Sequence, residues 1–285
     1  MRDFLRELPH PLRQASRFGR TCIRFCQHRA ARVYPQPVII GGSPKSGTTV
    51  IAALLAKAVG AQFSNDPFWH VLYHDAKDFL LPDILEGRLT VDEFINRFGA
   101  YFQARIIKDP DFAFLYPQLK ARFPQSQQVF IVRDPRDNIR SILNRLKIPG
   151  NLRELEPEDN FIPSSQKGWR AIVDGRGLAI SRGNYISRLS QRWCLGTRQY
   201  FDAKSSIHLV RYEDFVADKV GVIEQLADDL GLAVVNDISG EVDKQFQPRG
   251  DRNAVLENFF GRENLRIIEA TCAKPMSAFG YAAGA

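Results

Sequence analysis

The stretch IIGGSPKSGTT, residues 39–49, joins an apolar run to a glycine-rich turn. Gly42 and Gly47 are five residues apart, as in the phosphate-binding loop G-x-x-x-x-G-K-[ST], but Thr48 follows Gly47 and the lysine of this loop is Lys45. A strand that runs into the start of a helix presents unpaired backbone N–H groups and the positive end of the helix dipole. The stretch therefore predicts a phosphate or sulfate site whose lysine is placed differently from that of ATP-binding loops.

Apolar runs and helical patterns alternate along the rest of the chain. Short apolar runs, typical of buried parallel strands, occur at residues 37–40, 105–108, 128–132 and 207–211. Helical patterns separate them, at residues 48–60, 112–122, 136–147, 185–203, 218–230 and 262–274. This alternation predicts an α/β fold, a P-loop-like parallel sheet flanked by helices on both faces. Ligands bind such sheets beyond the carboxyl ends of the strands, where four polar segments converge: 41–49, 108–110, 133–137 and 211–215.

The basic charge of the chain is concentrated at its start. The net charge is +7, and residues 1–36 carry +6 of it, with eight arginines against one aspartate and one glutamate. The rest is nearly neutral, so a nucleic-acid partner is not expected. We predict a basic arm at 1–36 and one domain at 37–285. Apolar residues at helical spacing predict that the arm is a helix docked on the domain, with contact to an anionic membrane or a partner as the alternative; they are Leu12, Ala15, Phe18, Cys22, Cys26, Ala30 and Val33.

Residues 149–184 interrupt the alternating pattern. They contain three prolines and five glycines, with Phe161 and Trp169 among them, and are predicted to form a substrate-binding or lid loop. No apolar run is long enough to span a membrane, and no secretory signal is recognised. The four cysteines are scattered, which favours reduced thiols and a cytoplasmic location.

Two segments together carry a family resemblance. PKSGTT at 44–49, followed by VFIVRDPRDNIRSILNRL at 129–146, resembles the sulfotransferases that use 3′-phosphoadenosine 5′-phosphosulfate (PAPS). The resemblance extends over residues 37–281 and includes RYEDF at 211–215 and CAKPMSAFGY at 272–281. It implies transfer of a sulfuryl group from PAPS to a hydroxyl or amine, with adenosine 3′,5′-bisphosphate as the product and no metal ion required.

The same resemblance implies which residues hold PAPS. The first segment would hold the 5′-phosphosulfate, through Pro44, Lys45, Ser46, Gly47, Thr48 and Thr49. Arg133 and Ser141 would hold the 3′-phosphate, with an ordinary salt bridge from Arg133 to Asp134 or Asp137 as the structural alternative. QPRGDRN at 247–253 is similar to a cofactor loop of the family and adds Arg249 and Gly250. Lys45 is the candidate to stabilise charge on the leaving phosphate oxygen.

The catalytic base is sought near the ends of two strands. In the cytosolic branch of the family the base is a histidine, but the matching position here is Pro110, so that branch is not expected. Lys108 is a candidate catalytic contact, or else the ion-pair partner of Asp109 or Asp111. Asp66 matches the acidic base of branches that resemble tyrosylprotein sulfotransferases, although Asp followed by proline is also a good helix N-cap. His70 is the second candidate for the base, and with His74 it forms a weaker candidate for a metal site.

Two other functions agree with parts of this sequence. A P-loop kinase or NTPase would need a magnesium carboxylate where Arg133 stands, and a non-catalytic nucleotide-binding module would bind the bisphosphate without transfer. The acceptor is expected to be a carbohydrate, a lipid or another small molecule. Phe161 and Trp169 are suited to stacking on a ring, and three arginines are suited to an acidic acceptor: Arg170, Arg176 and Arg182.

Overall fold

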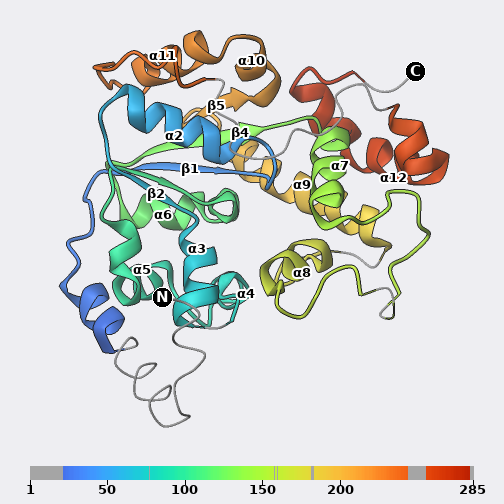
Figure 1. Cartoon of the computed structure of the whole chain (residues 1–285), viewed down its shortest axis with the longest axis horizontal. Coiled ribbons are helices and arrows are strands. Elements are labelled where there is room, and N and C mark those ends of the chain that lie inside the picture. Colours follow the sequence, from blue (N-terminus) through green and yellow to red (C-terminus); the bar gives the residue numbers. More distant parts are fainter. Residues whose placement is uncertain are drawn as a thin grey trace.

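A central sheet surrounded by helices forms the body of the computed structural model shown in Figure 1. The structure describes residues 22–76, 78–156, 158, 160–180, 183–242 and 255–282. The sheet has the order β2-β3-β1-β4-β5 and contains β1 (Val38–Gly42), β2 (Phe63–Asn65), β3 (Ile106–Lys108), β4 (Gln127–Val132) and β5 (Ile207–Arg211). Every neighbouring pair is parallel. The predicted α/β fold is confirmed, with β2 as a strand that the sequence did not predict.

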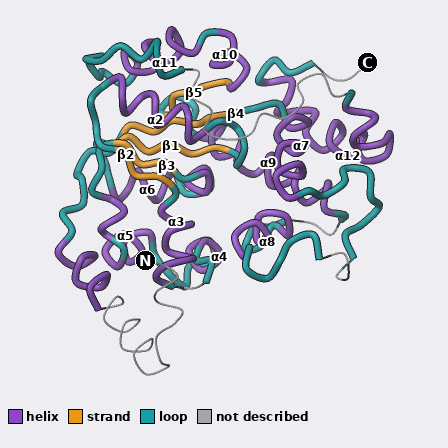
Figure 2. Tube along the Cα trace, in the orientation of Figure 1, coloured by secondary structure: helices purple, strands orange, loops and turns teal. Residues whose placement is uncertain are grey.

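Strand β1 lies at the centre of the sheet, as Figure 2 shows. All five of its residues are buried, and Ile40 pairs with Lys108 of β3 on one side and Val129 of β4 on the other. After β1 the chain forms β2 and β3 on one side of it and then crosses to form β4 and β5 on the other. The carboxyl end of β1 is therefore the switch point of the sheet, where open α/β sheets bind their ligands.

Helices cover both faces of the sheet. One face packs against α2 (Thr48–Ala58), α10 (Tyr212–Ala217) and α11 (Lys219–Asp229), which lie above the sheet in Figure 1. The other face packs against a second set, α6 (Tyr116–Arg122), α7 (Pro135–Leu146), α9 (Tyr185–Asp202) and α12 (Leu256–Ala278). Val38 and Ile40 face the first set and Ile39 the second, because successive side chains of a strand point to opposite faces.

Short elements fill the region between β2 and α6. They are α3 (Pro67–His70), the π-helix η2 (Val71–Asp75), α4 (Leu81–Leu85), α5 (Val91–Arg97), and the 3-10 helices η3 (Gly99–Phe102) and η4 (Pro110–Phe114). A capping box starts α5, where Thr90 and Glu93 each accept from the other's backbone N–H. The helix predicted at 112–122 is divided into η4 and α6 at Leu115, whose φ of −127° is not helical.

Residues 22–30 of the arm are helical and contact the domain through His28. The His28 ring is buried, accepts the Ala100 N–H at 3.3 Å and lies 3.4 Å from the Asp75 carboxylate. Of the residues predicted to form the apolar face, Cys22, Cys26 and Ala30 are exposed, whereas Val33 is partly buried and packs against the core. Residues 1–21, with Leu12, Ala15 and Phe18, lie outside the described residues.

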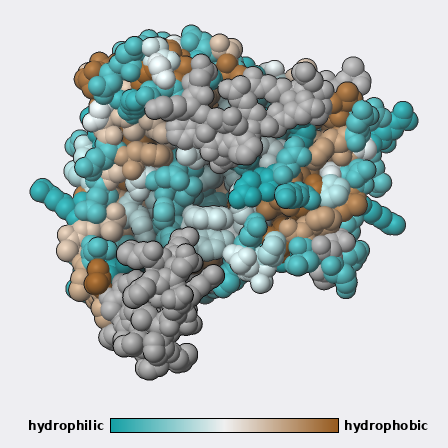
Figure 3. Space-filling view, viewed as in Figure 1, coloured by the Kyte–Doolittle hydropathy of each residue, from teal (hydrophilic) through white to brown (hydrophobic). Residues whose placement is uncertain are grey.

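The predicted loop at 149–184 includes a helix, α8 (Lys167–Asp174), which ends at Gly175 in left-handed geometry. Trp169 and Phe161 pack against the core beneath α7 and α9. Hydrophilic side chains cover much of the molecular face in Figure 3, with apolar side chains exposed between them. Among the described helices, none combines the length and the apolar character needed to cross a membrane.

Candidate active site

The glycine-rich turn follows β1 and leads into α2. Gly47 has φ 78° at the start of α2, and a side chain there would meet the Tyr212 ring, whose nearest atom lies 2.5 Å from the ideal Cβ position. No side chain caps α2, so its first backbone N–H groups are not used by a capping residue. Lys45 also has a positive φ, 69°. The turn therefore has the geometry of a backbone anion site at a helix N-terminus.

Residues that follow the neighbouring strand β4 hold this turn in place. The Asn138 side-chain amide donates to the Pro44 carbonyl at 2.7 Å and to Ser46 Oγ at 2.9 Å. Arg133 Nη1 donates to the Lys45 carbonyl at 3.1 Å. Pro44 and Ser46 are buried, so the structure shows them shaping the loop. Asn138 was not predicted as a site residue, although it lies in the segment RDPRDN that carried the resemblance.

Three cationic side chains meet beside the turn. Burial lowers the pKa of Lys45, and the positive charges of Arg145 and Arg133 lower it further. The Arg133 guanidinium lies 4.6 Å from the centre of the Tyr212 ring. Because like charges repel, this arrangement favours a bound anion over none. Arg145 was not predicted from the sequence.

The salt bridges considered for Arg133 are made by other arginines. Asp134 pairs with Arg136 at 2.7 Å, and Asp137 pairs with Arg140 at 2.8 Å. Ser141 lies two turns into α7 and is partly exposed. The predicted Arg249 and Gly250 lie outside the described residues.

Two predicted catalytic residues lie in contact at the ends of β2 and β3. Lys108 Nζ donates to Asp66 Oδ1 at 2.7 Å, to Thr49 Oγ1 at 2.7 Å and to Asn65 Oδ1 at 3.2 Å. The Lys108 side chain is 2% exposed, and that of Asp66 is 28% exposed. Lys108 therefore joins the candidate base to the first turn of α2. The ion-pair partner of Lys108 is Asp66. The alternative prediction, an ion pair with Asp109 or Asp111, is wrong.

Asp66 occupies the predicted N-cap position of α3, but its side chain does not cap the helix. Asp66 has φ 51° and its side chain makes no capping hydrogen bond. The Phe68 N–H instead donates to Asp109 Oδ2 at 2.8 Å, and the Asp111 N–H donates to Asp109 Oδ1 at 3.0 Å. Burial raises the pKa of Asp109 well above its usual value, and the nearby Asp111 raises it further. Asp109 thus fixes the start of α3 and leaves the Asp66 carboxylate to Lys108.

His70 is the last residue of α3. Its ring stacks on Tyr101 at 5.3 Å and on His74 at 5.6 Å, and the Tyr101 hydroxyl donates to Asp75 at 2.7 Å. In the described part of the chain, no group of three His, Cys, Asp or Glu residues is arranged to hold a metal ion. The contacts of His70 are thus with aromatic neighbours from η2 and η3.

Other buried groups hold the strand ends in place. Trp193 Nε1 donates to the Arg133 carbonyl at 3.0 Å, and Trp193 is 1% exposed. Arg192 forms a buried ion pair with Asp111 and lies over the Phe114 ring at 4.8 Å. Through these contacts, Arg192 and Trp193 of α9 support the site at the strand ends.

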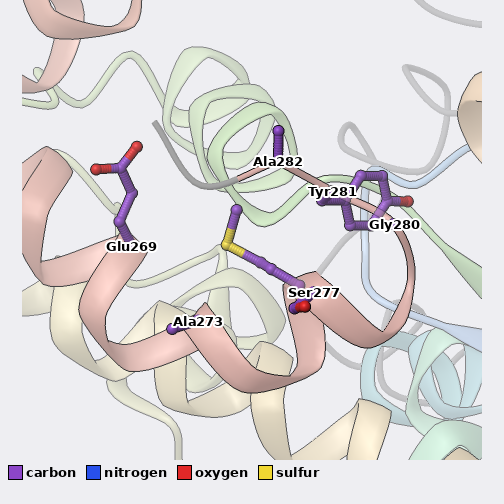
Figure 4. A pocket seen from close by; sticks show the side chains of 7 residues that line it. Glu269, Ala273, Ser277, Gly280, Tyr281 and Ala282 are labelled. Carbon is purple, nitrogen blue, oxygen red and sulfur yellow. The ribbon is translucent and has the colours of Figure 1, made fainter. Parts of the chain in front are cut away.

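A pocket of about 350 Å³ lies along the C-terminal half of α12. Figure 4 shows Glu269 and Tyr281 at its two ends. Its links to the site are indirect: Glu269 pairs with Arg136 at 3.3 Å, and the Tyr281 hydroxyl donates to Glu213 at 2.8 Å. Glu213 in turn accepts the Asp134 N–H at 3.0 Å. The predicted site residues do not line this pocket.

Comparisons with known proteins agree with this geometry. The Sulfotransferase domain family model matches residues 35–254. No curated protein matches the sequence. The chain is similar to the sulfotransferase domain from the curacin biosynthetic pathway, with 15% identity over 89% of this chain and 100% of that chain and a TM-score of 0.51.

Two mycobacterial structures are also similar. Sulfotransferase STF9 from Mycobacterium avium has 14% identity over 91% of this chain and 81% of that chain, with a TM-score of 0.52. Sulfotransferase STF1 from Mycobacterium tuberculosis H37Rv has 12% identity over 89% of this chain and 80% of that chain, with a TM-score of 0.50. At these identities the likeness shows the shared fold. Because the family model covers well over half of the chain, this protein belongs to the sulfotransferase domain family.

Proposed function

We propose that this sulfotransferase uses PAPS as its donor and a hydroxyl group of a small molecule as its acceptor. The observation that carries the proposal is the meeting, at the carboxyl edge of the sheet, of an anion-binding turn and an ion-paired carboxylate. Lys45 and Arg133 supply positive charge on the turn side. Asp66, held by Lys108, supplies a proton acceptor on the other. Sulfuryl transfer to a hydroxyl needs both.

The residues present fit a donor with two anionic groups. The backbone N–H groups at the start of α2, with Lys45, suit the 5′-phosphosulfate. Arg133 follows β4 and Ser141 lies on α7, which suits the 3′-phosphate because guanidinium groups bind phosphate in a bidentate way. When bound, PAPS supplies a sulfuryl group linked to the 5′-phosphate through a bridging oxygen.

Each charged side chain then has a role in the transfer. The acceptor hydroxyl oxygen would form the new bond to sulfur. The Asp66 carboxylate would accept the proton that this hydroxyl loses. Lys108 holds that carboxylate, and Thr49 links Lys108 to α2. Lys45 and the α2 N–H groups balance the negative charge that develops on the 5′-phosphate as its bond to sulfur breaks.

Nucleotide binding tests the donor assignment. Adenosine 3′,5′-bisphosphate should bind about ten- to hundredfold more tightly than AMP by calorimetry, because a charge-assisted contact contributes about 1.5–3 kcal/mol. Arg133→Ala should remove most of the difference. Arg198→Ala is the matched control, since Arg198 is an exposed arginine on α9. Equal affinity for the two nucleotides in the unmodified protein would refute the proposal.

Turnover separates the remaining alternatives. A single-turnover assay with labelled PAPS distinguishes an enzyme from a module that only binds the nucleotide. Magnesium-dependent ATP hydrolysis would instead identify an NTPase. We also propose residues 37–285 as the catalytic domain, 1–36 as an appended arm and the cytoplasm as the location; fractionation of cells tests the location.

A further inference from the structure

Aromatic side chains follow Asp66 along α3 and continue onto α8, where Trp169 is partly buried. Trp69 lies three residues after Asp66 and is 37% exposed. Its ring contacts Tyr73 at 4.6 Å and meets the edge of Trp169 at 6.3 Å between ring centres. In Figure 1, α8 lies to the right of α3 and below α7. The surface next to the candidate base is thus built from two tryptophans that come from distant parts of the chain.

A glycine allows this close packing. A side chain at Gly168 would meet the Trp69 ring, since the nearest ring atom lies 2.8 Å from the ideal Cβ position. The Gly168 N–H also donates to the Tyr73 hydroxyl at 3.4 Å. The first turn of α8 therefore rests directly on Trp69, and the two rings have a defined relative orientation.

Arg145 extends this surface towards the anion site. It lies in the last turn of α7, with its guanidinium 6.0 Å from the centre of the Trp169 ring, and its side chain is exposed. Among the described residues, no carboxylate forms an ion pair with Arg145. A helix dipole favours a cation in the last turn, but that does not require one stacked on an aromatic ring.

Two of the three arginines expected to receive an acidic acceptor have other partners. Arg170 donates to the Ile162 carbonyl, and Arg176 lies 3.5 Å from the Asp78 carboxylate. Arg182 lies outside the described residues. Arg145, from a different segment, lies beside the aromatic surface.

We propose that Trp69, Trp169 and Arg145 form the acceptor subsite, and that the acceptor is a ring-bearing hydroxy acid. Its hydroxyl would lie at Asp66, its ring on the tryptophans and its carboxylate at Arg145. A guanidinium stacked on an aromatic ring keeps its N–H edge for a carboxylate. This inference rests on the proposed function, which places the reacting hydroxyl at Asp66. Hydroxyaryl acids and uronic acids share this chemistry.

Matched pairs of acceptors test the inference. One pair is 4-hydroxyphenylacetate and its methyl ester; the other is 4-nitrophenyl β-glucuronide and the corresponding glucoside. For at least one pair, the acid should have a kcat/KM about tenfold higher than its neutral partner. Arg145→Gln should raise the KM of the acid about tenfold and remove the preference, and Arg145→Glu should reverse it. Arg198→Gln, an exposed arginine on α9, should keep the preference.

Binding of adenosine 3′,5′-bisphosphate is measured in every variant. Three results would be unexpected in a protein that still prefers the bisphosphate over AMP. The acid and neutral acceptors react equally, no acceptor reacts, or the preference for the acid acceptor survives in Arg145→Gln. Each of these results overturns the acceptor subsite and leaves the donor assignment intact. Loss of the bisphosphate preference in the unmodified protein would instead overturn the proposed function.

Discussion

Asp66→Asn removes the proton acceptor while preserving the backbone around it. Asp66 adopts a left-handed conformation, with φ 51°, which asparagine tolerates better than other residues with a side chain. The amide oxygen of asparagine can still accept from Lys108. If Asp66 is the general base, kcat should fall by about 10²–10⁴, the usual contribution of such a group. The affinity for adenosine 3′,5′-bisphosphate should stay the same.

The effect on stability follows from the burial of the ion pair. Removing one partner of a fully buried pair costs about 3–5 kcal/mol. The Asp66 side chain is 28% exposed, and Lys108 keeps Thr49 and Asn65 as acceptors. We therefore expect Asp66→Asn to lower the free energy of unfolding by only about 1–2 kcal/mol. Asp66→Ala should cost about 1–2 kcal/mol more, since alanine does not favour left-handed geometry. The cap of α3 is unaffected because Asp109 supplies it.

Denaturant unfolding and single-turnover kinetics at saturating donor measure the two effects separately. His70→Ala is the comparison, because His70 follows Asp66 on α3 and contacts Tyr101 instead of Lys108. A kcat near the unmodified value in Asp66→Asn, together with a loss of 10²-fold or so in His70→Ala, would refute the assignment and make His70 the base. Full activity in both variants would exclude both residues.

Two further predictions concern the anion site and the arm. Burial and the charges of Arg145 and Arg133 lower the pKa of Lys45. The affinity for the bisphosphate should therefore weaken as the pH rises through that lowered pKa, and Lys45→Arg should show no such loss. Identical pH profiles of the two proteins in calorimetry would contradict this prediction. Deleting residues 1–33 removes His28 and uncovers Tyr101, which should lower the Tm by about 3–6 °C without changing bisphosphate affinity. A folded truncation that no longer binds the bisphosphate would show that the arm belongs to the site.

Local patterns were enough for four of the five strands and for the position of the glycine-rich turn. Four strands are short apolar runs, and β1, β3 and β4 are buried on both faces; such runs can be recognised without knowing their neighbours. The turn at 43–47 follows β1 directly and precedes α2, so its anion-binding geometry depends on residues close in sequence. The short strand β2 was not predicted, because FSN contains only one apolar residue and is a strand only by pairing with β3.

The pairing of Lys108 with Asp66 was decided by that strand pairing. Asn65 is in register with Lys108 across β2 and β3, which brings the next residue, Asp66, to the lysine. Asp109 is closer in sequence but points to the opposite side of the chain from Lys108, since side chains alternate along an extended segment. Nearness in sequence therefore favoured the wrong partner, and also the wrong cap for α3.

The sequence by itself determined the fold class, the glycine-rich turn and the candidates Lys45, Arg133, Asp66 and Lys108, because these depend on residue type and on order along a strand or turn. Only the tertiary structure decided which of these side chains meet. It also brought Arg145 beside Trp169, from helices separated by an irregular segment. Contacts of this kind depend on how helices pack across the sheet, and packing is set by the shape of the whole core and not by any one stretch of chain.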